Sequence, residues 1–182
     1  MPEEAVYFAR EDYVGFLGRL AIDCIDLGVL LAAYILVGIF IPEEYLRPIL
    51  ILWFIVAYLY LAILKAAGIP TIGYWVVKAR IVDPKGNPPS LFKATVRFCF
   101  AFIGPINFIL DLIWISSDRY RQALRDKFGH TYVVKNTAKP VGIGEILYRR
   151  YFILGYSFIF AEIKETAKKG ADDNSDKTQV NN

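Results

Sequence analysis

Two long apolar runs constrain the fold of this chain more than any other feature. The first run, over about 20–41, contains only Asp23 and Asp26 as charged residues and would form a helix about 33 Å long. The second run covers about 49–67 and contains one charged residue, near its end. A helix needs roughly 20 apolar residues to cross a bilayer, so both runs predict transmembrane helices. The short polar turn at 42–48 joins them as an antiparallel hairpin.

Composition supports a small integral membrane protein and excludes several other classes. Of 182 residues, 55% are hydrophobic and 21% are charged, and the length fits one domain. The net charge of +3 is too small to indicate a nucleic-acid partner. The chain contains no nucleotide-binding, zinc-protease or serine-hydrolase motif, so we expect neither an enzyme nor a cofactor or metal site. The expected partner is the lipid bilayer.

A third apolar segment, 98–115, is interrupted by Gly104-Pro105 and has Asp111 in its second half. It could form either a kinked third crossing or two short helices that re-enter the membrane. Basic residues are frequent on both sides of the segment, whereas the turn at 42–48 has only one. Cytoplasmic loops are rich in lysine and arginine, so both flanks are expected to be cytoplasmic, which favours the re-entrant arrangement.

The remaining segments complete the predicted fold, an all-α membrane protein with a small β element. The β-branched runs at 77–83 and 131–135 predict two short strands that pair in the cytoplasm. Residues 1–18 form a cytoplasmic segment, and 136–165 predicts an amphipathic, aromatic helix at the membrane interface, with a dimer contact as the alternative. The polar tail 166–182 predicts disorder. We expect a multi-pass protein of the cell membrane with both termini in the cytoplasm.

The charged residues inside the apolar runs are the candidate functional residues. Arg19, Asp23 and Asp26 fall within a 60° stripe of one helix face at 100° per residue, and such a stripe cannot face lipid. With Asp111, these residues could line a site for a monovalent cation or a proton. Asp111 and Asp26 would share a proton if they met. In the alternative, Arg19 only extends toward the headgroups and pairs with Asp23.

Several short motifs, in this order along about residues 15–135, resemble the RDD family of membrane proteins. They are Gly15-Phe-Leu-Gly-Arg19-Leu-Ala-Ile-Asp-Cys-Ile-Asp26, Pro70-Thr-Ile-Gly73, Lys78-Ala-Arg-Ile-Val-Asp83-Pro-Lys-Gly86, Arg121-Gln-Ala-Leu-Arg-Asp126-Lys and Thr131-Tyr-Val-Val134.

The resemblance carries expectations for individual residues. It places the arginine and the two aspartates for which the family is named on Arg19, Asp26 and Asp126. Tyr74 and Arg125 stand where the family often has lysine and histidine, and Asp23 is an additional carboxylate. By resemblance, the chain is expected to transport an unknown ligand, with cation/proton exchange in some members, or to act as a membrane scaffold, as in some eukaryotic relatives.

Two functional hypotheses follow. In the first, Arg19, Asp23, Asp26 and Asp111 line a transport pathway; two spans hardly enclose a pathway, so this hypothesis requires a homo-oligomer or a larger membrane complex. In the second, the protein is a non-transporting scaffold or assembly adaptor. A structural clamp of Arg19 with Asp126, beside Arg121, then ties the strand pair to the membrane helices.

Overall fold

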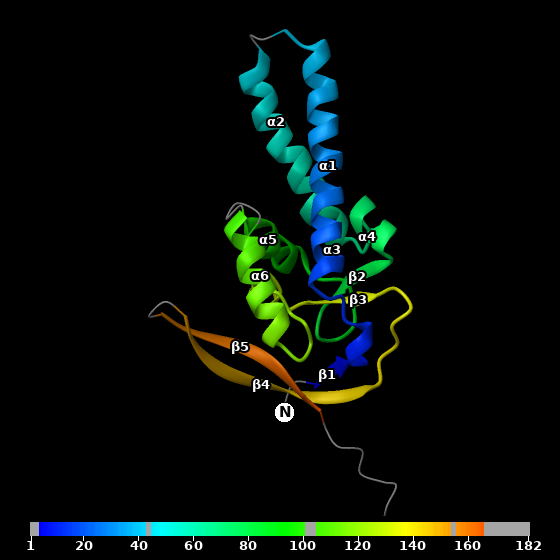
Figure 1. The fold of residues 1–182 in the computed structure, drawn as a ribbon, viewed down its shortest axis with the longest axis vertical. Helices are drawn as coiled ribbons and strands as arrows, with labels where there is room; N and C mark the ends of the chain where they lie inside the picture. Colours follow the sequence, from blue (N-terminus) through cyan, green and yellow to red (C-terminus); the bar gives the residue numbers. More distant parts are fainter. Residues whose placement is uncertain (1–3, 43–44, 101–104, 154–155, 166–182) are drawn as a thin grey trace, which may run out of the picture.

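Two long apolar helices extend from the rest of the molecule as a hairpin (Figure 1). The computed structural model describes residues 4–42, 45–100, 105–153 and 156–165. Helix α1 is Phe16–Phe40, and the second arm is a continuous helical run of α2 (Leu46–Tyr58), a π-helical turn η3 (Leu59–Ile63) and α3 (Leu64–Ala66). The stretches Phe16–Phe40 and Pro48–Ala66 are long and apolar enough to cross a membrane. These bounds agree with the predicted spans to within a few residues.

The outer part of this hairpin exposes large apolar side chains. On α1, Leu36 and Ile39 are 60% and 70% exposed, and on the second arm Ile51 is 68% exposed. A water-soluble protein rarely leaves so large a contiguous apolar surface uncovered. This surface therefore suits a lipid environment.

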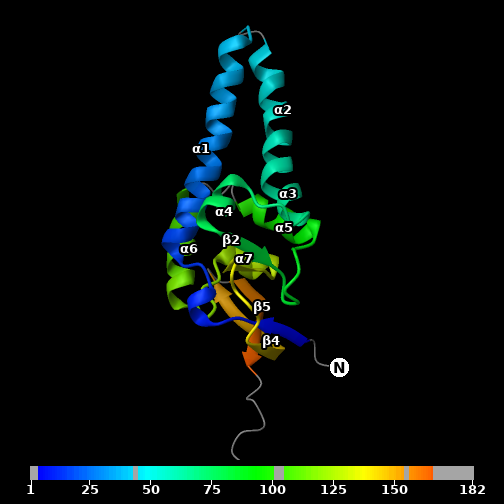
Figure 2. The same cartoon turned by 90° about the vertical axis from the view of Figure 1, so that its right-hand side faces the viewer.

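The third apolar segment is divided between two helices. Helix α5 is Leu91–Cys99 and helix α6 is Pro105–Ser117, so they are about 14 and 20 Å long at 1.5 Å per residue, short of a bilayer core of about 30 Å. Residues 101–104, which include the predicted break at Gly104, lie outside the described residues. Figures 1 and 2 both place α5 and α6 at the base of the long hairpin rather than along its length.

The predicted strand pair is present at the centre of the molecule. Helix α4 (Ile72–Val77) leads into strand β2 (Ala79–Val82), and helix α7 (Leu124–Gly129) leads into strand β3 (Tyr132–Lys135). Both helices end at a residue with a left-handed backbone, Lys78 (φ 56°) and His130 (φ 47°). The strands pair antiparallel, and alternate residues contribute to two hydrophobic clusters on opposite faces. The face that carries Ile81 and Val133 packs against Ile22 of α1 and against Val14, which precedes that helix.

The prediction of an all-α fold is wrong, because the described residues also form a second antiparallel sheet. Strand β1 (Glu4–Tyr7), strand β4 (Gly142–Ile153) and strand β5 (Tyr156–Glu165) are ordered β1-β4-β5. The segment predicted as a C-terminal interfacial helix is therefore a long hairpin, and the N-terminal segment supplies its third strand. Aromatic and β-branched residues are frequent in β4 and β5, and such residues favour the extended backbone.

Aromatic packing fixes the hairpin of β4 and β5 to the rest of the molecule. The ring of Phe128 in α7 lies 5.3 Å from the ring of Phe158 and 5.1 Å from that of Phe160, both in β5. Beside them, the Lys127 ammonium pairs with Asp118 at 2.5 Å and with Glu162 of β5 at 3.4 Å. The sheet therefore packs on α7, the helix that carries Asp126.

Candidate functional site

The charged stripe of α1 points into the protein at the base of the long hairpin. Arg19 is 2% exposed and Asp26 is 3% exposed, whereas the Asp23 side chain is 21% exposed. The stripe does not converge on one site. Each residue contacts different partners, and the predicted pairing of Arg19 with Asp23 is replaced by two separate ion pairs.

Arg19 forms its ion pair with Asp126 of α7, and Arg97 of α5 binds the other oxygen of the same carboxylate. Asp126 is fully buried and also accepts a hydrogen bond from the backbone N–H of Ala123 at 3.1 Å. A carboxylate buried in this way needs both counter-charge and hydrogen-bond donors, and this site supplies them. The cluster joins α1, α5 and α7.

The remaining donors of the two arginines are bound to the residues around them. Arg19 donates from Nε to the carbonyl of Val14 at 3.0 Å and from Nη2 to the carbonyl of Arg121 at 2.8 Å. Arg97 donates to the Thr131 hydroxyl at 2.8 Å. Arg121 has a left-handed backbone (φ 48°) and contributes to the cluster through its carbonyl, while its guanidinium binds the Tyr13 carbonyl at 3.1 Å. The three residues of the predicted clamp thus lie together.

Asp26 lies two turns further along α1 and holds the N-terminus of α4. It accepts hydrogen bonds from the Thr71 hydroxyl at 2.6 Å, from the Gly73 N–H at 2.8 Å and from the Tyr60 hydroxyl at 3.0 Å. The Gly73 N–H belongs to the first turn of α4, where backbone donors have no partner within the helix. The Lys65 ammonium lies 3.9 Å from Asp26 Oδ2, beyond hydrogen-bond distance.

The approach of α4 to α1 at this point requires a glycine at position 73. A Cβ atom on Gly73 would lie 2.5 Å from the carbonyl oxygen of Ile22 and 2.9 Å from Asp26 Oδ1. Both distances are too short for a carbon atom. The Thr-x-Gly motif therefore brings a hydroxyl and a bare backbone amide to the carboxylate of α1.

Asp23 and Asp111 share Arg125 of α7. The Arg125 guanidinium binds Asp23 through two hydrogen bonds, at 3.1 and 2.6 Å, and its Nε lies 3.3 Å from Asp111 Oδ2. Burial by itself lowers the pKa of Arg125, but the Asp23 and Asp111 carboxylates outweigh this effect and raise it. Arg125 therefore keeps its charge and links α1, α6 and α7.

Asp111 is the least satisfied carboxylate of the network. Its side chain is 4% exposed, and its Oδ1 atom has no hydrogen-bond partner among the described residues. Burial raises the pKa of Asp111, although the nearby guanidinium of Arg125 acts in the opposite direction. The structure pairs Asp111 with Arg125 and Asp26 with α4, so the condition for proton sharing, a contact between these two carboxylates, is not met.

The complete network contains equal numbers of acidic and basic side chains. Its members are Asp23, Asp26, Asp111 and Asp126 with Arg19, Lys65, Arg97 and Arg125. Sequence reasoning missed the contributions of Arg97, Arg125, Lys65 and Tyr60. Thr71 lay in a motif already noted. Arg97 belongs to a helix with one other charged residue, Lys93, and nothing in the sequence distinguished the two. Across the described ranges, no three His, Cys, Asp or Glu side chains are arranged to hold a metal ion.

Comparison with known proteins gives a family but no individual relative. No curated protein and no solved structure matches the chain. The RDD family matches residues 13–130. This range includes the ion pairs of Asp126 with Arg19 and Arg97, those of Arg125 with Asp23 and Asp111, the Thr-x-Gly motif and strand β2. With two apolar helices of membrane-spanning length, this match makes the chain a membrane-associated protein. The chain belongs to the RDD family.

Proposed function

We propose that this protein is a non-transporting membrane scaffold, in which the charge network locks a mixed helical and β unit beneath a two-helix anchor. The observation that carries the proposal is the pairing of all four predicted carboxylates with cations of the same chain. At Asp23, Asp111 and Asp126 a transported cation would have to replace a buried arginine. One of these arginines, Arg19, also holds two backbone carbonyls. Such arginines fix a fold more readily than they exchange a ligand.

The topology supports an anchor with both ends of the chain on one side of the membrane. Strand β1 pairs with β4 from Glu4↔Glu145 to Tyr7↔Gly142, so the N-terminal strand lies beside a strand that follows all the predicted membrane segments. The two strands can pair only if the chain crosses the membrane an even number of times between β1 and β4. Together with the basic flanks of 98–115, this pairing supports the proposal of a cell-membrane protein with both ends in the cytoplasm. The partners are then the lipid bilayer and a larger membrane complex.

The proposal is tested by measuring ion flux with the full chain in liposomes. A pH gradient across the vesicles is expected to decay at the protein-free rate in the presence of Na⁺, K⁺ or Li⁺. Asp26→Asn and wild type should behave alike in this assay. A cation-dependent decay that is present in wild type and absent in Asp26→Asn contradicts the scaffold and supports transport.

Proton or cation exchange is the second candidate, and it rests on Asp111. Two carboxylates share one guanidinium, and one oxygen of Asp111 is buried without a hydrogen-bond partner in the described part of the chain. A carboxyl group in this setting can take up a proton while Asp23 keeps Arg125 charged. This exchange would proceed in a homo-oligomer, with Arg19, Asp23, Asp26 and Asp111 near the pathway.

Asp111 gives this second candidate a stability signature. The raised pKa of Asp111 means that the folded state binds the proton more tightly than the unfolded state does. The protonated Asp111 therefore stabilises the fold fully below the unfolded pKa, and this stabilisation is lost as pH rises through the folded pKa. Asp111→Asn removes this dependence. Thermal unfolding between pH 4 and 8 should show the variant gaining stability relative to wild type as pH rises. The control Asp12→Asn should show no such trend. If the difference in thermal stability between Asp111→Asn and wild type is the same at every pH, Asp111 is not protonated in the folded state.

A further inference from the structure

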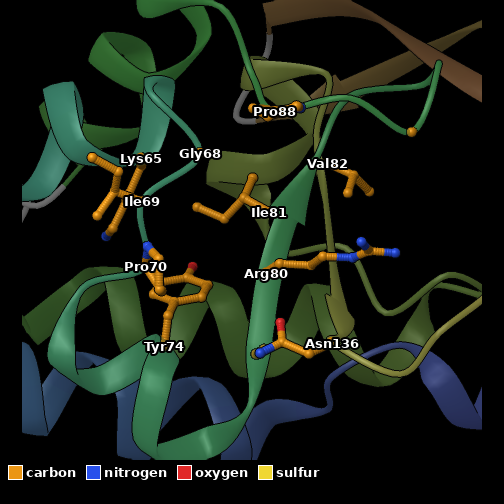
Figure 3. A pocket seen from close by; sticks show the side chains of 12 residues that line it. Lys65, Gly68, Ile69, Pro70, Tyr74, Arg80, Ile81, Val82, Pro88 and Asn136 are labelled. Carbon is orange, nitrogen blue, oxygen red and sulfur yellow. The ribbon is translucent and has the colours of Figure 1, made fainter.

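A cavity of about 310 Å³ opens beside the charge network, at the end of the second long helix (Figure 3). Its walls come from the connection between α3 and α4, from strand β2 and from the turn that follows β2. Gly68 (φ 75°) and Pro88 face each other across these two loops, since a Cβ on Gly68 would lie 3.0 Å from Pro88 Cγ. The loops thus support one another, and the cavity is of the size of small-molecule sites.

Lys65 supplies the positive charge of this cavity. Its side chain is 14% exposed, and its ammonium lies 4.9 Å from the centre of the Tyr74 ring. Within the described residues it makes no hydrogen bond, and the nearest carboxylate oxygen is that of Asp26 at 3.9 Å. An ammonium has three donors, so Lys65 keeps donors available for a ligand.

The other polar side chains show which ligand charge the cavity accepts. None of the described residues that line it carries a carboxylate. The Arg80 guanidinium is bound to the Ala138 carbonyl at 2.9 Å and extends away from Lys65, whereas Asn136 lines the cavity with an amide that makes no hydrogen bond in the described ranges (Figure 3). The Asp26 carboxylate near Lys65 is not among the residues that line the cavity, so the ammonium and the free amide favour an anion with further polar groups.

The surroundings of the cavity connect it to the lipid-facing surface. Ile69 lines the cavity and is 51% exposed, and on α4 Ile72, Trp75 and Val76 are exposed as well. Exposed tryptophan beside apolar side chains is typical of the membrane–water interface. Lys65 follows the second long apolar stretch, at the level where lysine meets lipid headgroups.

We propose that this cavity binds a glycerol-linked phosphate, with Lys65 as its ion-pair partner and Asn136 as a hydrogen-bond donor to the polar head. The source favoured by the exposed apolar border is an anionic phospholipid of the adjoining leaflet, whose chains stay in the membrane while its head enters beside Ile69. The site is separate from the arginine cluster around Asp126 and does not depend on the scaffold proposal.

The test is a titration of the full chain in zwitterionic micelles with dihexanoyl-phosphatidylglycerol and, separately, with dihexanoyl-phosphatidylcholine, followed by tryptophan fluorescence. Wild type should bind the phosphatidylglycerol at least about tenfold more tightly, because only this head is net anionic and offers glycerol hydroxyls. Lys65→Gln and Asn136→Asp should reduce the preference to less than twofold. The second variant leaves Lys65 and Asp26 unchanged, so it remains informative if Lys65→Gln unfolds.

Lys85→Gln is the matched control, because Lys85 is an exposed lysine outside the cavity. It should keep the full preference. Equal affinity of wild type for the two lipids overturns the proposal, as does a loss in Lys85→Gln as large as that in Lys65→Gln, which would indicate surface charge alone. Displacement of the lipid by millimolar sn-glycerol 3-phosphate supports a soluble source of the phosphate, and retention of the lipid supports the membrane source.

Discussion

Replacing Asp126 by asparagine is expected to lower the free energy of unfolding by about 3–5 kcal/mol, the largest effect of any single change in the charge network. The carboxylate is fully buried and is the counter-charge of both Arg19 and Arg97. Its removal leaves two guanidinium groups in the interior without an anion, and the new amide places donors against donors. In detergent, the midpoint of thermal unfolding should fall by roughly 10 °C.

The clamp also predicts the order of effects within the cluster. Arg19→Met leaves Arg97 and Asp126 as a neutral pair, and Arg97→Met leaves Arg19 and Asp126, so each should destabilise less than Asp126→Asn. Asp12→Asn is the control, since the Asp12 carboxylate makes no ion pair or hydrogen bond within the described part of the chain. If Asp126→Asn unfolds at the wild-type temperature, Asp126 does not act as a clamp.

Sequence periodicity predicted which face of α1 avoids lipid, because the spacing of the charged residues alone determines which helix face they share. Partners depend on tertiary contacts: Arg19 meets a carboxylate 107 positions away and Arg125 meets one 102 positions away. Two of the residues that depart from the family pattern are also partners in the structure. The additional carboxylate Asp23 and the arginine that replaces the frequent histidine, Arg125, bind each other, so two of the three departures form one ion pair.

The C-terminal hairpin was missed because its apolar run was judged by its length. The apolar run 151–161 has eleven residues, which are too few to cross a membrane. A helix lying at the membrane interface was therefore predicted. Strand β4 ends at Ile153 and β5 begins at Tyr156, so two positions, occupied by Leu154 and Gly155 in the sequence, separate two aromatic-rich runs. A glycine between two such runs indicates a turn, although Leu-Gly is not one of the dipeptides typical of two-residue hairpins. Pairing with β1 could not be predicted, because nothing local relates residues 4–7 to the chain's other end.

Gly73→Ala should destabilise the protein by about 1–3 kcal/mol or more, although it adds a single methyl group. The new Cβ would overlap the Ile22 carbonyl oxygen and Asp26 Oδ1, which belong to backbone and a fixed carboxylate rather than to a flexible side chain. Helix α4 must therefore move away from α1, and Asp26 then loses the Gly73 N–H. The hydrogen exchange of the α4 amides should increase together with the loss of thermal stability.

Gly28→Ala is the matched control on α1 itself, because nothing lies within 4 Å of a Cβ at that position. Alanine there removes the conformational freedom of glycine inside a helix and should be neutral or stabilising by about 0.5–1 kcal/mol. Opposite signs for the two glycine-to-alanine changes would locate the requirement at the contact between α4 and Asp26. Equal effects of the two changes would mean that the Thr-x-Gly motif does not hold α4 against α1 through close packing.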